Sequence, residues 1–139
     1  MRRPAQGFTV LEFAILAAAV VFVTTLTVSK YRDISSRAKS HACRGALNGI
    51  RSGIELYYAD HMAADGYASY PTVEQITSRG VVIQGAVPPN PYQAAGNAPD
   101  SIVLGTTRGE TVGARGGWVY NRETGELWAN TTGHGEESF

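Results

Sequence analysis

The sequence has few of the residues that build disulfides, metal clusters or catalytic sets. Its one cysteine, Cys43, excludes an internal disulfide and a cysteine-based metal cluster. His41 lies two positions from Cys43, the wrong spacing for a Cys–His pair on one helix face, and His61 and His134 show no metal-ligand spacing. We recognise neither a Ser–His–Asp set nor a phosphate-binding glycine loop. We therefore expect a protein that is not an enzyme and that needs no cofactor.

The chain also has no excess of charge of one sign, because its twelve Lys and Arg residues balance twelve Asp and Glu residues. The charges are unevenly spread: residues 30–61 hold six basic and three acidic side chains, and residues 62–139 hold four basic and eight acidic ones. No aromatic platform or nucleic-acid-binding motif accompanies the basic segment, so a solvated helix face explains it best. No nucleic-acid partner is predicted.

Apolar sequence is abundant near the N-terminus. Residues 1–7, MRRPAQG, are polar and positive, and the chain from Phe13 to Ser29 has no charged residue. Counted from Phe8, this segment has 22 residues, close to the ~20 that cross a bilayer. The pattern predicts membrane insertion or export. One carboxylate, Glu12, lies near the start of the run, and a carboxylate in hydrocarbon is costly unless it is paired.

A long helix is predicted from Phe8 to about Asp60, because no proline interrupts this span. At 1.5 Å per residue it would be roughly 80 Å long, so the small head cannot bury it, and its first half must contact lipid or other subunits. Its second half carries one apolar face, formed by Leu47, Ile50, Ile54, Tyr57 and His61.

Three glycines at intervals of four, Gly45, Gly49 and Gly53, lie in the same stretch. Each costs about 1 kcal/mol in a helix interior. We therefore expect the backbone of a sheet or of a neighbouring helix to approach this stripe closely.

The remaining chain predicts a small head. The helix should end within Ala64–Pro71, and TVEQ is a capping box with Thr72 as N-cap, opening a short helix that stops at Gly80. Strands are expected at Gly80–Gly85 and Ser101–Gly105. GWVYN-RETG-ELWAN predicts a hairpin whose apolar face packs on the long helix, formed by Trp118, Tyr120, Leu127 and Ala129.

Three interpretations of the N-terminus are open at this point. A cleaved secretory signal fits poorly, because cleavage after Ala17–Ala19 would leave an apolar mature end and Glu12 would interrupt the signal core. A plain single-span anchor carrying a binding module explains the apolar run but gives Glu12 no role. The third interpretation rests on the residues around Glu12 themselves.

GFTVLEFAI, starting at Gly7, resembles the N-terminal signature of type IV pilins and of the pseudopilins of type II secretion. That signature is a short basic leader, glycine, phenylalanine, threonine, two aliphatic residues and glutamate. The tail GGWVYNRETGELWAN is similar to the closing hairpin of many pseudopilin-like proteins. The resemblance implies an α+β, lollipop-like fold in which a long N-terminal helix, its first half transmembrane, packs against a small C-terminal antiparallel β-sheet.

The resemblance also implies roles for individual residues. A prepilin peptidase would cut between Gly7 and Phe8 and N-methylate the Phe8 amine. Glu12 would pair with the Phe8 amine of a neighbouring subunit, and so govern recruitment and register. The chain would be a structural filament subunit, alone or with other pilins, assembled by an inner-membrane platform and an ATPase. Before assembly it would cross the bacterial inner membrane once with its head outside, and afterwards form a periplasmic pseudopilus or a cell-surface pilus.

The expected organisation is a leader at residues 1–7, a transmembrane and polymerisation half-helix at 8–29, an amphipathic half-helix at 30–62, and a head at 63–139. Two departures from the family pattern stand out. Ser29 occupies the place of a frequent helix proline, which favours a continuous helix, and a single cysteine precludes the C-terminal disulfide of many pilins. The acidic residues of the head show no calcium-loop pattern, so calcium is not expected, and carbonyl oxygens would supply much of any such site. Pilus and pseudopilus, and major and minor subunit, stay open alternatives, as do adhesion, motility, DNA uptake and protein export.

Overall fold

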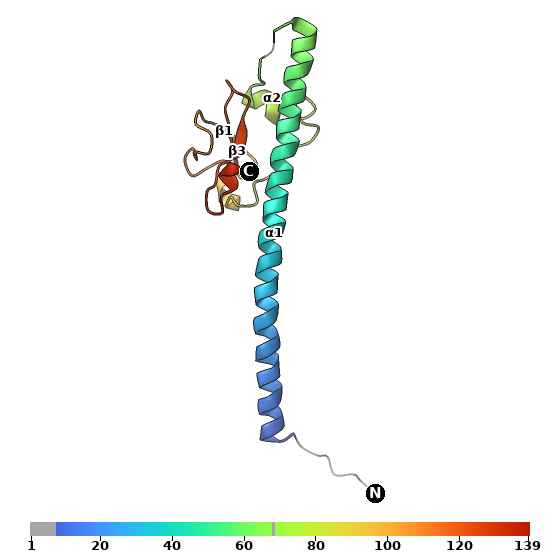
Figure 1. Ribbon diagram of the computed structural model, residues 1–139, viewed down its shortest axis with the longest axis vertical. Helices are drawn as coiled ribbons and strands as arrows, with labels where there is room; N and C mark the ends of the chain where they lie inside the picture. Colours follow the sequence, from blue (N-terminus) through green and yellow to red (C-terminus); the bar gives the residue numbers. More distant parts are fainter. Residues whose placement is uncertain (1–7, 68) are drawn as a thin grey trace. The chain divides into compact units, whose positions relative to one another are not determined.

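The computed structural model of the chain describes residues 8–67 and 69–139, and at residues 29 and 65 the backbone alone. The elements are α1 (Val10–Asp65), α2 (Val73–Thr77), β1 (Ile102–Leu104), β2 (Trp118–Tyr120) and β3 (Leu127–Ala129), with 3-10 turns at Ala95–Asn97 and Glu136–Ser138 (Figure 1). A long helix with a small sheet confirms the α+β class. The chain divides into two compact units, Met1–Ala38 and Lys39–Phe139, and α1 contributes to both.

In the first unit α1 is rich in β-branched residues, yet it is helical throughout its described length. Neither glycine nor proline occurs between residues 8 and 44, so no backbone signal interrupts it. The hydroxyls of Thr24 and Thr27 donate to the Val20 and Val23 carbonyls at 2.9 and 2.8 Å. These bonds satisfy polar groups inside an apolar segment. The helix passes residue 29 without a break, as expected where proline is missing.

In the second unit α1 buries three of the five residues of the predicted stripe, whereas Tyr57 and His61 are half-buried. Leu47, Ile50 and Ile54 are at most 1 % exposed, and Cys43 extends the stripe by one turn. They share one hydrophobic core with a second set of side chains, Trp118, Tyr120, Leu127 and Ala129. The β2–β3 register places Trp118 opposite Ala129 and Tyr120 opposite Leu127, which confirms the predicted hairpin and its helix-facing side.

Within the described chain, one of the three glycines of the stripe is closely approached by another segment. Only Gly53 meets a close neighbour, since a Cβ there would lie 2.5 Å from the Val82 carbonyl oxygen and 3.1 Å from Ile83 Cγ2. A Cβ at Gly45 or Gly49 would have nothing within 4 Å. Within the described chain the expected close approach is therefore confirmed at Gly53 alone, and approach of a neighbouring subunit's helix to Gly45 and Gly49 stays a prediction.

The sheet is mixed, which corrects the expected antiparallel sheet. Its strand order is β1-β2-β3, and β2 pairs antiparallel with β3 but parallel with β1. β1 confirms the strand expected at Ser101–Gly105. A parallel pair needs a long crossover, and residues 105–117 provide one between β1 and β2.

The strand expected at Gly80–Gly85 is also wrong. This segment makes an isolated bridge between Arg79 and Ile83 and otherwise turns, with Gly80 at φ +79°. Val82 and Ile83 pack on the helical side of the core instead of joining the sheet. The capping box between Thr72 and Gln75 is confirmed, but α2 ends at Thr77 rather than at Gly80.

Candidate functional site

The first turn of α1 contains Glu12, the predicted assembly residue, in contact with Thr9. Glu12 Oε2 accepts hydrogen bonds from the Thr9 backbone N–H and hydroxyl, both at 2.8 Å, and the Glu12 N–H donates to the Thr9 hydroxyl at 3.2 Å. This is a capping box, in which the side chains of the first and fourth residues each satisfy the other's backbone N–H. Sequence reasoning missed it, although its signal, T-x-x-E before an apolar run, is visible at residues 9–12.

The capping box engages one oxygen of the carboxylate. Both bonds from Thr9 reach Oε2, and Oε1 accepts none from the residues that the structure describes. Glu12 is exposed, and its place at the N-terminal end of a long helix favours negative charge. The arrangement therefore orients an ionised carboxylate, and no described residue donates a hydrogen bond to its second oxygen.

Phe8, a second predicted site residue, lies beside this turn. Phe8 is 72 % exposed and directly precedes Thr9. Gly7, on the other side of the predicted cleavage point, lies outside the described residues. Cleavage between Gly7 and Phe8, N-methylation of Phe8, and pairing of its amine with Glu12 all stay predictions.

The surface that follows is apolar. The large apolar side chains from Phe8 to Val28 are 56–87 % exposed. α1 is long and apolar enough to cross a membrane, and none of its most apolar 18-residue window is buried. The segment therefore has a span-forming composition and receives no cover from the residues that the structure describes.

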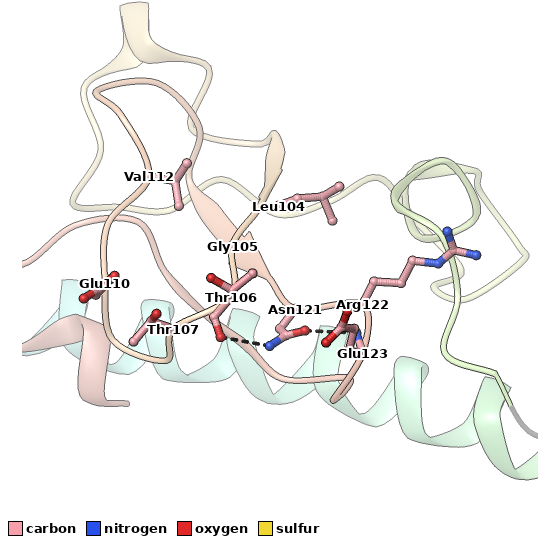
Figure 2. Close-up of a pocket in the computed structure, with 9 residues that line it drawn as sticks. All are labelled: Leu104, Gly105, Thr106, Thr107, Glu110, Val112, Asn121, Arg122 and Glu123. Carbon is pink, nitrogen blue, oxygen red and sulfur yellow. Dashed lines mark hydrogen bonds between the residues drawn. The ribbon is translucent and has the colours of Figure 1, made fainter.

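The head contains a cavity of about 390 Å³ beyond the end of β1, next to the hairpin turn (Figure 2). Asn121 organises its wall: its side-chain N–H donates to the Thr106 carbonyl at 3.0 Å, and its oxygen accepts the Glu123 N–H at 2.9 Å. Glu110 and Glu123 are its two carboxylates. Across residues 8–67 and 69–139, no group of three or more His, Cys, Asp or Glu is placed to hold a metal ion.

Two residues with reactive potential in the sequence are held in structural positions. Cys43 is fully buried, and burial raises the pKa of its thiol to about 11. Asn130 begins an N-x-T sequence, but it is 3 % exposed and its amide donates to the carbonyls of Val112, Arg115 and Gly116. These side chains serve packing and loop structure.

Comparison with protein-family models gave no match, and comparisons with curated proteins and with solved structures gave none either. The candidate site therefore rests on its own residues: the Thr9–Glu12 capping box, Phe8 beside it, and the exposed apolar helix that follows.

Proposed function

We propose that the chain is a structural subunit of a type IV pilus-like or type II secretion pseudopilus filament. It crosses the bacterial inner membrane once, with its head outside, after a prepilin peptidase has cut between Gly7 and Phe8 and methylated the new amine. A platform and an ATPase then draw it into a polymer of like subunits. The function is mechanical: filament growth through a bundle of α1 helices.

The observation that carries this proposal is the state of Glu12. Its capped oxygen is bonded within its own chain, whereas Oε1 accepts no bond from the described residues. In a low-dielectric surrounding such a carboxylate gains strongly from an ammonium partner. A neighbour's Phe8 amine supplies that charge, so docking relieves a penalty that the single subunit carries in the membrane.

One observation favours the alternative, a membrane-anchored binding module that does not polymerise. The capping box gives Glu12 a purely local role, since it closes the helix N-terminus without any neighbour. The two functions differ in what they require of Glu12: the filament needs its negative charge, whereas the cap needs only an acceptor oxygen.

Glu12→Gln separates the two, because glutamine also completes a capping box but carries no charge. Thr9→Val is the matched variant, since it removes the capping hydroxyl and keeps the carboxylate. In the native host, each variant replaces the wild-type chain, and filaments are recovered by shearing or by cross-linking of neighbouring subunits. Membrane insertion is measured in parallel by carbonate extraction.

The filament proposal predicts that Glu12→Gln inserts normally but lowers the assembled fraction roughly ten-fold or more, as expected for breaking a buried ion pair. Thr9→Val should have the smaller effect. Normal assembly of Glu12→Gln would contradict the proposal. Mass spectrometry of the wild-type N-terminal peptide adds an independent check, since the proposal requires a species that begins at N-methylated Phe8.

A further inference from the structure

The charged segment that follows the apolar run carries an unbalanced positive charge. Residues 30–38 hold Lys30, Arg32 and Arg37 against Asp33, a net charge of +2 from three cations and one anion. Asp33 pairs with Arg37 at 3.2 Å, as residues four apart on a helix do. Lys30 and Arg32 have no carboxylate partner among the residues that the structure describes, and both are exposed.

The distance of Lys30 and Arg32 from the apolar run places them at the depth of the lipid headgroups. The 21 residues from Phe8 to Val28 match a hydrocarbon layer of about 30 Å, and the headgroup region adds about 5–7 Å on each side. At about 1.5 Å per residue, Lys30 and Arg32 lie about 3 and 6 Å beyond Val28, whereas Arg37 lies about 14 Å beyond it. Lys30 and Arg32, which have no carboxylate partner in the described part of the chain, therefore fall within the headgroup layer, and the ion-paired Arg37 falls outside it.

Tyr31, next to both cations, has a side chain that also suits the headgroup layer. Tyr31, between the two cations, is 72 % exposed. Tyrosine is enriched at membrane–water interfaces because its ring is apolar and its hydroxyl is polar. Lysine and arginine with long apolar stems can reach phosphate oxygens from this depth.

We propose that Lys30 and Arg32 bind the phosphate groups of anionic phospholipids at the head-side end of the span. This inference rests on the membrane insertion included in the proposed function, but not on polymerisation. Zwitterionic lipids attract the pair less, because their own ammonium group neutralises the phosphate. The bound lipids hold the subunit at one depth and neutralise the segment.

The test uses the full chain in nanodiscs of phosphatidylcholine and phosphatidylglycerol at four to one, with the retained lipids identified by native mass spectrometry. The variant is Lys30→Gln with Arg32→Gln. Arg79→Gln with Arg115→Gln is the control, because it removes two exposed head cations and changes the net charge equally. Glycerol phosphate, added in a separate arm, tests whether a soluble phosphate competes for the same residues.

We expect wild type and the control to retain phosphatidylglycerol with a roughly 10- to 30-fold enrichment, and the Lys30/Arg32 variant to lose it. Enrichment that survives in that variant, disappears equally in the control, or is abolished by millimolar glycerol phosphate would overturn the lipid assignment. Co-elution with the nanodiscs reports insertion separately, and failure to insert would refute both proposals. A chain that inserts and enriches lipid but never assembles in its host would refute only the filament.

Discussion

Gly53 permits a contact that no other residue type allows at this point of α1. A Cβ atom at residue 53 would lie 2.5 Å from the Val82 carbonyl oxygen and 3.1 Å from Ile83 Cγ2. In Gly53→Ala the loop must move, because ordinary contact begins near 3.4 Å. Gly49→Ala, one helical turn earlier, adds the same methyl group where nothing lies within 4 Å.

The magnitudes follow from two opposing effects. Alanine gains about 0.8–1.0 kcal/mol over glycine in a helix interior, so we expect Gly49→Ala to stabilise the head by about that amount. Overpacking typically costs about 1–3 kcal/mol, so Gly53→Ala should be unchanged or destabilised by up to about 2 kcal/mol. The helix-propensity gain is common to both variants, and their difference, about 1–3 kcal/mol, isolates the clash.

Urea unfolding of the full chain in mild detergent measures this difference. Trp118 and Trp128 are both buried in the head at 0 and 1 % exposure, so tryptophan fluorescence reports its unfolding. One kcal/mol corresponds to about 4–8 °C in Tm for a domain of this size, which makes a thermal scan a second readout. If Gly53→Ala proved as stable as Gly49→Ala, the packing of the 81–83 segment on α1 would be refuted.

Three further predictions concern the head. Cys43 should resist thiol reagents in the folded chain and react only after unfolding, because its thiol is buried; rapid labelling of native protein, followed by mass spectrometry, would contradict this. Burial raises the pKa of Tyr120 to about 12 from the 10.0 of a free tyrosine. The folded state therefore holds this proton more tightly than the unfolded state does. The resulting contribution to the free energy of unfolding is fully present below pH 10 and is lost as pH rises through about 12. Tyr120→Phe should flatten that part of the pH profile, and an unchanged slope would oppose the assignment. Arg51→Met should lower the free energy of unfolding by about 1.5–3 kcal/mol, because the guanidinium donates to the Leu127 carbonyl at 2.9 and 2.6 Å and to the Phe139 oxygen at 2.6 Å. The matched variant Arg51→Lys keeps the positive charge but loses the forked geometry of the guanidinium donors. Full stability of Arg51→Met in urea would show that these hydrogen bonds contribute little.

Local patterns were enough to predict several elements. The hairpin follows from two alternating runs around a glycine-containing turn, and the buried stripe of α1 follows from its helical spacing. The Thr72–Gln75 capping box was visible in four letters. The same four-letter pattern at Thr9–Glu12 was equally available, and it changes the interpretation of Glu12, because one of its oxygens has a partner within the chain.

Long-range contacts could not be predicted in this way. Gly80–Gly85 has strand-like composition, but packing Val82 and Ile83 against the helical side of the core takes it out of the sheet. The parallel pairing of β1 with β2 depends on how residues 105–117 cross over, and a flexible loop sequence does not encode that direction. Gly53 differs from Gly45 and Gly49 only through the segment that happens to approach it.

The sequence by itself determined the helix, its apolar first half and the isolated carboxylate Glu12 within it, because each depends on residues close together along the chain. Only the tertiary structure decided which glycine is in contact, which apolar run leaves the sheet, and how the strands are ordered. Those outcomes depend on which distant segments pack best together in one small core. The total packing of these segments decides this, rather than any one local sequence pattern.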